Sequence, residues 1–243
     1  MGGPQHTTRR RALGFIAAGS VAGATALRAQ QTSADVDLNL VLAVDASGSV
    51  NQLRFDLQKR GYADAFANRQ VLRAVRSGPN AAIAAMMFQW TGPSRIAPVI
   101  GWTRLHDEGS IDQFAAAIAA TPRFLFGGGT SLSGAIDAGM AALQATPFRG
   151  GRRVIDISGD GANNRGRPAE LARDAAVATG VNINGLPILE VEPDLEEYFR
   201  ERVIGGPGAF VIAAETFADF GNAILRKLIL EIAATPQAGR QSA

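Results

Sequence analysis

Apolar residues along this chain form short continuous runs separated by stripes with helical spacing. The runs over residues 38–44 and 152–158 predict strands buried on both faces, as in the interior of a parallel sheet. The run over 98–102 contains Pro98, which places that strand at a sheet edge. Further strands are predicted over residues 81–90, 181–188 and 209–213.

Between these runs, apolar residues recur every three or four positions and predict amphipathic helices. The last helix carries Phe217, Phe220, Ile224, Leu228 and Ile232 on one stripe and ends before Pro236. The other predicted helices cover residues 51–67, 70–75, 111–120, 132–143, 169–179 and 195–203. Strands that alternate with helices predict an α/β fold: a doubly wound, mostly parallel sheet flanked by helices, with one antiparallel edge strand.

A polar turn follows the first predicted strand. It places Asp45, Ser47 and Ser49 at alternate positions, and we expect Ser49 to cap the helix that begins near Asn51. A carboxylate and two hydroxyls are hard oxygen ligands of the kind that suit magnesium, calcium or manganese. Taken alone, the turn is more typical of a simple Asx-turn that leads into a helix cap.

Two other loops carry related chemistry. Residues 127–131 (GGGTS) precede a helix that Thr130 or Ser131 caps, and the glycines allow close approach of the backbone. Asp160 stands between two glycines directly after the strand over 152–158. The carboxyl ends of parallel strands meet at one edge of an open α/β sheet, where such folds bind ligands.

The order D-x-S-x-S, then Thr, then Asp resembles the metal-ion-dependent adhesion site of von Willebrand factor type A domains. The resemblance covers nearly the whole chain after the N-terminal segment. It implies that Ser47, Ser49 and Thr130 contact a metal through their hydroxyls, and that Asp45 and Asp160 hold it directly or through water. In that family one coordination position stays open for an acidic side chain of a partner.

A narrower resemblance rests on the stretches LVLAVDASGSV, LQKRGYADAF, RRVIDISGDGANNRG, VNINGLPI and VIGGPGAFV. They are similar to an exported bacterial group of this fold called domain of unknown function 1194. This resemblance sharpens the expected fold and implies nothing specific about partners.

The N-terminus has the features of an export signal. Residues 1–29 combine three consecutive arginines (9–11), a mild apolar stretch and a small residue at the expected cleavage point, which favours the twin-arginine route. The apolar stretch is too short for a stable membrane span. We therefore predict a periplasmic or secreted bacterial protein, with one domain over 35–235 and a loose tail over 236–243.

The net charge and the absence of cysteine exclude some classes of binding site. The whole chain has a formal charge of +2, but loss of Arg9, Arg10, Arg11 and Arg28 with the signal leaves −2, since all 22 acids remain. The basic isoelectric point is thus no argument for nucleic-acid binding. The chain contains no cysteine, which excludes disulfides and zinc–cysteine sites.

Together these features predict a non-enzymatic module that uses a divalent metal, magnesium first and calcium or manganese as alternatives, to bind an acidic group on a protein or peptide. The alternative is a metal-dependent hydrolase or phosphatase with Ser47 as nucleophile. His106 is the single histidine left after removal of the signal, so it is the only imidazole that could act as a general acid or base. A purely structural domain is disfavoured because all five ligand positions are filled.

Several residues allow two interpretations. Asp156, inside a buried strand, is expected to face a helix rather than to join the site. Asn163 and Asn164 either hydrogen-bond the metal loop or serve only as turn residues. Trp90 and Trp102 are expected to pack in the core or at the sheet edge.

Overall fold

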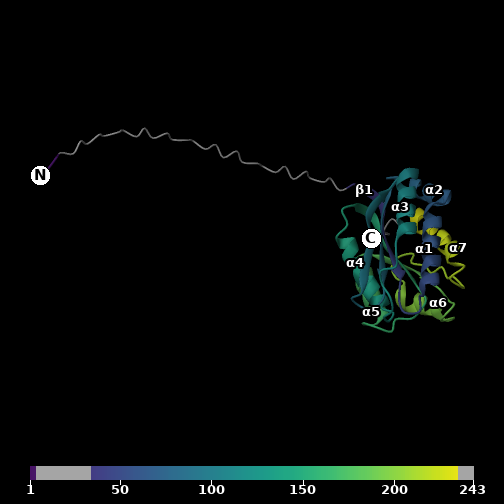
Figure 1. Cartoon of the computed structure of the whole chain (residues 1–243). Coiled ribbons are helices and arrows are strands. Elements are labelled where there is room, and N and C mark those ends of the chain that lie inside the picture. The colour runs from purple at the N-terminus through teal and green to yellow at the C-terminus, as the bar shows by residue number, and fades with distance from the viewer. Residues whose placement is uncertain (4–33, 235–243) are drawn as a thin grey trace, which may run out of the picture. The chain divides into compact units, whose positions relative to one another are not determined.

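A mixed sheet of five strands lies at the centre of the chain (Figure 1). The computed structural model describes residues 1–3 and 34–234. The chain divides into two units, Met1–Thr32 and Ser33–Ala243, and the sheet belongs to the second. The predicted signal after residue 3 and the predicted tail over 236–243 lie outside the described residues.

The strands lie in the order β3-β2-β1-β4-β5. The central strand β1 pairs in parallel with β2 and β4, and β4 pairs in parallel with β5. At one edge β3 runs antiparallel to β2, which confirms the predicted sheet. The strands are β1 (Asp35–Asp45), β2 (Ile83–Trp90), β3 (Ile96–Leu105), β4 (Arg149–Gly159) and β5 (Asn182–Pro187).

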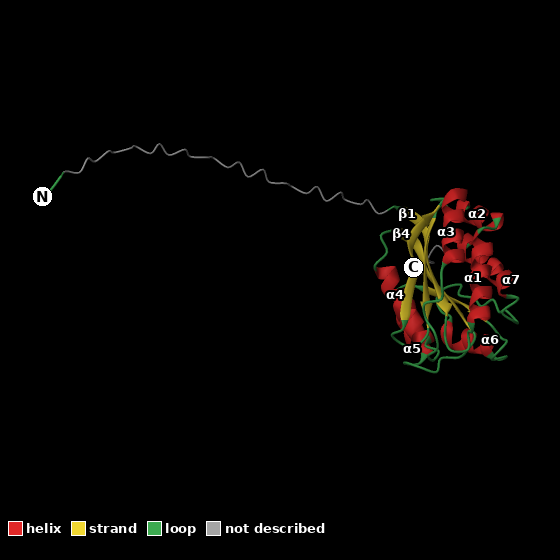
Figure 2. Cartoon of the chain, viewed as in Figure 1, coloured by secondary structure: helices red, strands yellow, loops and turns green. Residues whose placement is uncertain are grey.

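Helices cover both faces of the sheet (Figure 2). One face packs against α1 (Gln52–Phe66), α2 (Arg69–Arg76), α3 (Glu108–Ala120) and α7 (Phe220–Ala233). The other packs against α4 (Leu132–Gln144) and α5 (Ala169–Ala178). Helix α6 (Leu195–Tyr198) continues into the π-helical turn η1 (Phe199–Val203), which contacts α5 and β5.

The apolar run of β1 supplies both cores because successive side chains of a strand point to opposite faces. Leu40 and Leu42 belong to the cluster formed with α1 and α7, whereas Val41 and Ala43 belong to the cluster formed with α4. All four side chains are fully buried. This two-sided burial explains why the run contains no apolar–polar alternation. Within the described part of the chain, no helix combines the length and apolar character needed to cross a membrane.

The prediction of a sixth strand over 209–213 is wrong. This segment follows the edge of β5 through isolated parallel bridges at Val211 and Ala214. The Phe210 N–H donates to the side-chain Oδ1 of Asn184 at 3.0 Å, so one amide is diverted from any ladder. Pro187, at the end of β5, has no N–H to offer. A continuous strand pairing is therefore interrupted from both sides.

The predicted cap of the first helix is also wrong. Asn51 caps α1, and its side chain accepts a hydrogen bond from the Arg54 N–H at 3.0 Å. Ser131, one of the two candidates for the fourth helix, caps α4 and accepts from the Gly134 N–H at 3.2 Å. Ser49 is thereby left free for another role, described below.

Asp156 faces α7, as expected for a structural carboxylate. Its Oδ1 lies 2.8 Å from Nζ of Lys227, which also lies 2.6 Å from Oε1 of Glu231. Asn184 donates to the same Glu231 oxygen at 2.8 Å. All three charged side chains are buried, so this network ties β4 and β5 to α7 beneath the surface.

Candidate metal centre

The five predicted ligands come from three loops at the carboxyl edge of the parallel strands. Asp45 is the last residue of β1, and Ser47 and Ser49 lie in the turn that leads to α1. Asp160 directly follows β4, the neighbour of β1 in the sheet. Thr130 precedes the cap of α4. Parallel pairing thus brings residues distant in sequence to one edge.

Four of these residues are joined by short polar contacts. Asp45 Oδ1 accepts from the Ser47 N–H at 2.7 Å, and the hydroxyls of Ser47 and Ser49 are 3.3 Å apart. Ser49 Oγ donates to Asp160 Oδ1 at 2.6 Å. The Asp160 N–H approaches Asp45 Oδ2 at 3.4 Å. Ser49 therefore links the two strand ends, which explains why it does not cap α1.

Thr130 reaches the same region from the third loop. It is buried, and its Oγ1 lies 3.6 Å from the position that a Cβ on Gly161 would occupy, next to Asp160. The preceding glycine loop is held by Thr91, whose hydroxyl contacts the carbonyls of Gly127 and Gly129 at 2.9 Å each. The structure thus brings all five predicted ligand positions to one edge of the sheet.

Gly128 explains the need for glycine in this loop. Its φ of +95° lies in the region that glycine adopts readily, and a Cβ there would lie 2.7 Å from the Thr91 hydroxyl. Its carbonyl oxygen lies 3.0 Å from the Cβ position of Gly48. The glycine loop and the D-x-S-x-S turn therefore pack backbone to backbone.

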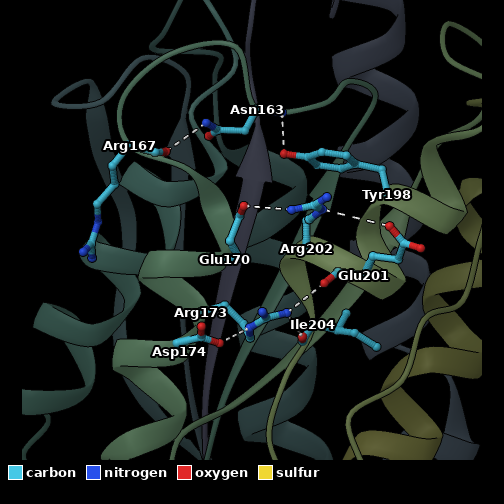
Figure 3. A network of polar contacts seen from close by, with 9 residues as sticks. All are labelled: Asn163, Arg167, Glu170, Arg173, Asp174, Tyr198, Glu201, Arg202 and Ile204. Atoms are coloured by element: carbon cyan, nitrogen blue, oxygen red, sulfur yellow. Dashed lines mark hydrogen bonds and ion pairs between the residues drawn. The ribbon is translucent and has the colours of Figure 1, made fainter.

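Asn163 and Asn164 hold the loops together and are more than turn residues. Asn164 Oδ1 accepts from the Thr130 N–H at 2.9 Å, and Asn163 Oδ1 accepts from the Ser133 N–H at 3.1 Å. The Asn163 N–H donates to the Tyr198 hydroxyl at 3.3 Å, a contact that Figure 3 shows. These bonds fix Thr130 relative to the loop that carries Asp160.

A polar network extends from this loop along α5 and η1 (Figure 3). Arg202 pairs with Glu170 at 3.0 Å, and the Arg173 guanidinium donates to the carbonyl of Glu201 at 3.0 Å. Asn163 Nδ2 donates to the Arg167 carbonyl at 3.0 Å. The network anchors the outer side of the Asp160 loop to two helical segments.

Sequence reasoning missed two residues that support the D-x-S-x-S turn. Gln58 is buried, and its Nε2 donates to the Asp45 carbonyl at 3.3 Å. Because it shares the inner face of α1 with Phe55 and Tyr62, a polar residue on an apolar stripe was an available signal. Arg123 Nη2 donates to the carbonyls of Ala46 and Ser47 at 3.1 and 3.2 Å. It lies in a long loop, where no periodicity marks it.

A third missed residue, Glu192, borders the other side of the centre. Its Oε2 accepts from the Ala162 N–H at 2.9 Å, and its Oε1 lies 3.2 Å from the Cβ position of Gly161. Burial is the main cause that raises the pKa of Asp160, and the charge of Glu192 adds to it. Glu192 follows β5 in an irregular segment, so no pattern in the sequence indicated it.

The pKa values of both carboxyl groups of the centre are raised above their ordinary values. Burial and, second, the charge of Asp160 raise the pKa of Asp45 to about 7. Burial also raises the pKa of Asp160, while the hydrogen bond from Ser49 opposes that shift. A cation between them would favour the charged forms of both.

The residues present fit a hard divalent cation. Asp160 Oδ2 is buried and has no hydrogen-bond partner within the described residues. Around it stand oxygen donors: one further carboxylate and three hydroxyls. Across residues 1–3 and 34–234, no group of three or more His, Cys, Asp or Glu side chains forms a metal cluster. Any cation at this centre would therefore be held by few charged ligands.

His106 and Trp102 lie away from the centre, whereas Trp90 pairs with Asp45 in the sheet and packs beside it. His106 follows β3, whose last residue pairs with the first residue of β2. It therefore lies at the amino ends of the parallel strands, and the centre lies at their carboxyl ends. Trp90 is fully buried, and the Trp102 indole N–H donates to the Ala142 carbonyl at 3.2 Å. The expectation of packing roles for both tryptophans is confirmed.

Comparison with known proteins places this geometry in context. The family model described as protein of unknown function (DUF1194) matches residues 35–236. No curated protein sequence gives a significant match. Several solved structures share the fold at low sequence identity, and three are described next.

The pilus adhesin SpaC from Lactobacillus rhamnosus GG aligns with a TM-score of 0.58 and 16% identity, covering 84% of this chain and 30% of that chain. Proximal thread matrix protein 1 from the mussel byssus, with a zinc-occupied MIDAS motif, gives 0.56 and 17%, covering 82% and 47%. A von Willebrand factor type A protein from Catenulispora acidiphila gives 0.50 and 15%, covering 82% and 43%.

This chain spans less than half the length of each of these three structures. Since the identities are low, the likeness shows a shared fold. The chain belongs to the DUF1194 family, and its domain has the fold of von Willebrand factor type A domains.

Proposed function

We propose that this chain is an exported bacterial binding module that holds a divalent cation at Asp45, Ser47, Ser49, Thr130 and Asp160. The bound cation would attract an acidic side chain of a protein or peptide partner. The observation that carries the proposal is the convergence of two buried carboxyl groups and three hydroxyls, with Asp160 Oδ2 left without a partner in the described part of the chain.

The ligand chemistry supports binding of an external anion. Two carboxylates balance the charge of a divalent cation only when both are ionised, and the hydroxyls add no charge. A cation held mainly through neutral oxygens keeps affinity for a further carboxylate. Magnesium fits this small set of hard oxygen donors best, and calcium or manganese are the alternatives.

The neighbouring structures favour the same class of function. One of them has a zinc-occupied MIDAS motif and another is a pilus adhesin. For this chain, export to the periplasm or the cell exterior rests on the N-terminal sequence.

The hydrolase alternative has weaker support. The Ser47 hydroxyl lies 3.3 Å from that of Ser49 and hydrogen-bonds the carboxyl of Asp45, which in the proposed site is a ligand of the cation and not a free general base. His106 lies at the opposite edge of the sheet. These positions favour a binding role for Ser47 over a nucleophilic one.

Calorimetric titration of the full chain with Mg²⁺, Ca²⁺ and Mn²⁺ tests the metal site. We expect saturable binding of one ion, which the isosteric variants Asp45→Asn and Asp160→Asn abolish because each removes one of only two charged ligands. Asp137→Asn is the matched control, since this carboxylate is exposed on α4 and pairs with Arg167. Absence of binding for all three ions, or unchanged binding in both site variants, would refute the proposal.

A further inference from the structure

Most of the exposed large apolar side chains of the domain stand around the candidate metal centre. Within residues 34–234 there are six such side chains. The four that stand around the centre are Leu53, Phe124, Phe126 and Val191, with exposed fractions of 69%, 56%, 61% and 42%. The other two, Leu171 and Leu230, lie on α5 and α7. Single exposed apolar residues are ordinary, but a group gathered at one site indicates an interaction surface.

Phe124 and Phe126 are held against the D-x-S-x-S turn by their loop. The Phe124 N–H donates to Oε1 of Gln89 at 2.8 Å, at the end of β2. Arg123 bonds the carbonyls of Ala46 and Ser47, and its guanidinium carbon lies 5.0 Å from the centre of the Phe126 ring. The exposure of the two rings therefore belongs to a loop that is bonded to the metal turn at several points.

Leu53 borders the turn from the first turn of α1. Its neighbour Arg54 donates to the Ser49 carbonyl at 2.8 Å and to Glu190 Oε1 at 2.7 Å. Val191 lies between Glu190 and Glu192, and the latter is bonded to the loop after Asp160. The four apolar residues thus come from three segments, each bonded directly to a loop that carries metal ligands.

Charge indicates what this surface would accept. Arg123 stands beside Phe126 and forms no ion pair with a carboxylate in the described part of the chain. A cation at the centre would add positive charge. The cation would attract a carboxylate of a partner, and apolar side chains next to that carboxylate would meet the four exposed residues.

We infer that Leu53, Phe124, Phe126 and Val191 form an apolar rim that selects partner segments in which an acidic residue is flanked by aromatic or large aliphatic residues. This inference rests on the proposed function, because the acidic residue is the one that the cation would hold. The rim then adds specificity, since apolar and aromatic contacts around a central polar anchor carry much of the affinity of such interfaces.

A random peptide library displayed on phage tests the rim. The immobilised full chain is loaded with Mg²⁺, and bound phage are eluted with EDTA. We expect enriched peptides to contain Asp or Glu with Phe, Tyr, Trp, Leu or Ile within two positions. The variant Phe124→Ser/Phe126→Ser should still enrich acidic residues but lose the apolar neighbours. Leu171→Ser/Leu230→Ser, which removes the two exposed leucines elsewhere, is the control and should select as the wild type does.

Titration of the best enriched peptide then gives the size of the effect. The rim variant is expected to bind it about tenfold or more weakly, a typical loss when two aromatic contacts are removed. The metal affinity of the variant should stay unchanged, which separates loss of the rim from loss of the fold.

The outcomes distinguish the two proposals. EDTA-eluted peptides with acidic residues but random neighbours would overturn the rim and leave the metal-dependent binding function standing. Apolar enrichment that persists in the rim variant would also overturn it. Absence of any acidic enrichment on the wild type would refute the proposed function and this inference with it.

Discussion

At the scale of single residues, the ionisation of Asp45 makes the stability of the domain depend on pH. Its pKa is raised from 3.8 to about 7, first by burial and second by the charge of Asp160. A carboxyl whose pKa is higher in the folded state favours folding while it is protonated. The free energy of unfolding therefore falls as the pH rises from about 3.8 towards 7, by an amount on the order of 4 kcal/mol.

This gives a prediction on pH dependence. In EDTA, the wild type should have a lower melting temperature at pH 8 than at pH 5, and Asp45→Asn should show a smaller drop because its residue 45 does not ionise. Saturating Mg²⁺ should raise the melting temperature of the wild type most at pH 8, where both carboxylates are available. Thermal unfolding of both proteins measures this.

The control for this experiment is Asp64→Asn, which changes an exposed carboxylate on α1. It should follow the wild type at each pH. Equal pH dependence in the wild type and in Asp45→Asn would show that Asp45 titrates normally in the folded chain.

The ligand residues were predictable from sequence because strand ends are visible in it. An apolar run that stops at Asp45, and another that stops before Asp160, place both carboxylates at one sheet edge. The role of Ser49 was mistaken because a cap and a tertiary hydrogen bond look alike in sequence: its hydroxyl bonds Asp160, 111 positions away. The roles of Arg123 and Glu192 could not be predicted, because both residues lie in irregular loops where no periodic pattern marks them.

At the scale of elements, helix α7 was predicted from its stripe, but its buried charges were not. Lys227 is buried between Asp156 of β4 and Glu231 one turn further along α7. Its Nζ also lies 5.7 Å from the centre of the Phe210 ring, which belongs to the segment wrongly predicted as a strand. Periodicity marks the position of Lys227 as inward-facing, but the partners that make its burial tolerable lie in other elements.

A substitution in this network has a large predicted effect. Lys227→Met should lower the free energy of unfolding by about 3–5 kcal/mol, since it leaves the carboxyl groups of Asp156 and Glu231 buried without their cation. Denaturant unfolding measures this, with the exposed neighbour Arg226→Met expected to change stability by less than about 0.5 kcal/mol.

The triple variant Asp156→Asn/Lys227→Met/Glu231→Gln separates two causes. If the loss comes from uncompensated charge, the triple variant should recover much of the stability of the wild type. If it remains as unstable as Lys227→Met, the cause is lost packing between α7 and the sheet.

At the scale of the whole molecule, the chain contains a folded domain preceded by a segment that we propose to be an export signal. The family match begins at residue 35, directly where β1 begins. Loss of residues 1–29 would reverse the sign of the net charge, so the exported form would be weakly acidic. The architecture was predictable at this scale because strand and helix patterns alternate. The irregular course after β5 was not, since it depends on the side chain of Asn184.

The export route gives a prediction of its own. Replacing Arg9, Arg10 and Arg11 by lysine keeps the charge of the N-terminal segment but removes both arginine pairs from that segment. Cell fractionation should then find the chain in the cytoplasm instead of the periplasm or medium. Export that continues unchanged in this variant would contradict the twin-arginine route, and export of neither protein would contradict the signal itself.

The order of the strands has a kinetic consequence for a cation at this centre. Asp45 and Asp160 are 115 positions apart in sequence and meet only after β1 and β4 have paired. Contacts of such long separation form late in folding. A bound ion would therefore contribute little to the folding rate and would act mainly by slowing unfolding. Outside the cytoplasm, where a chain that opens is exposed to proteases, resistance to opening would extend the lifetime of this protein.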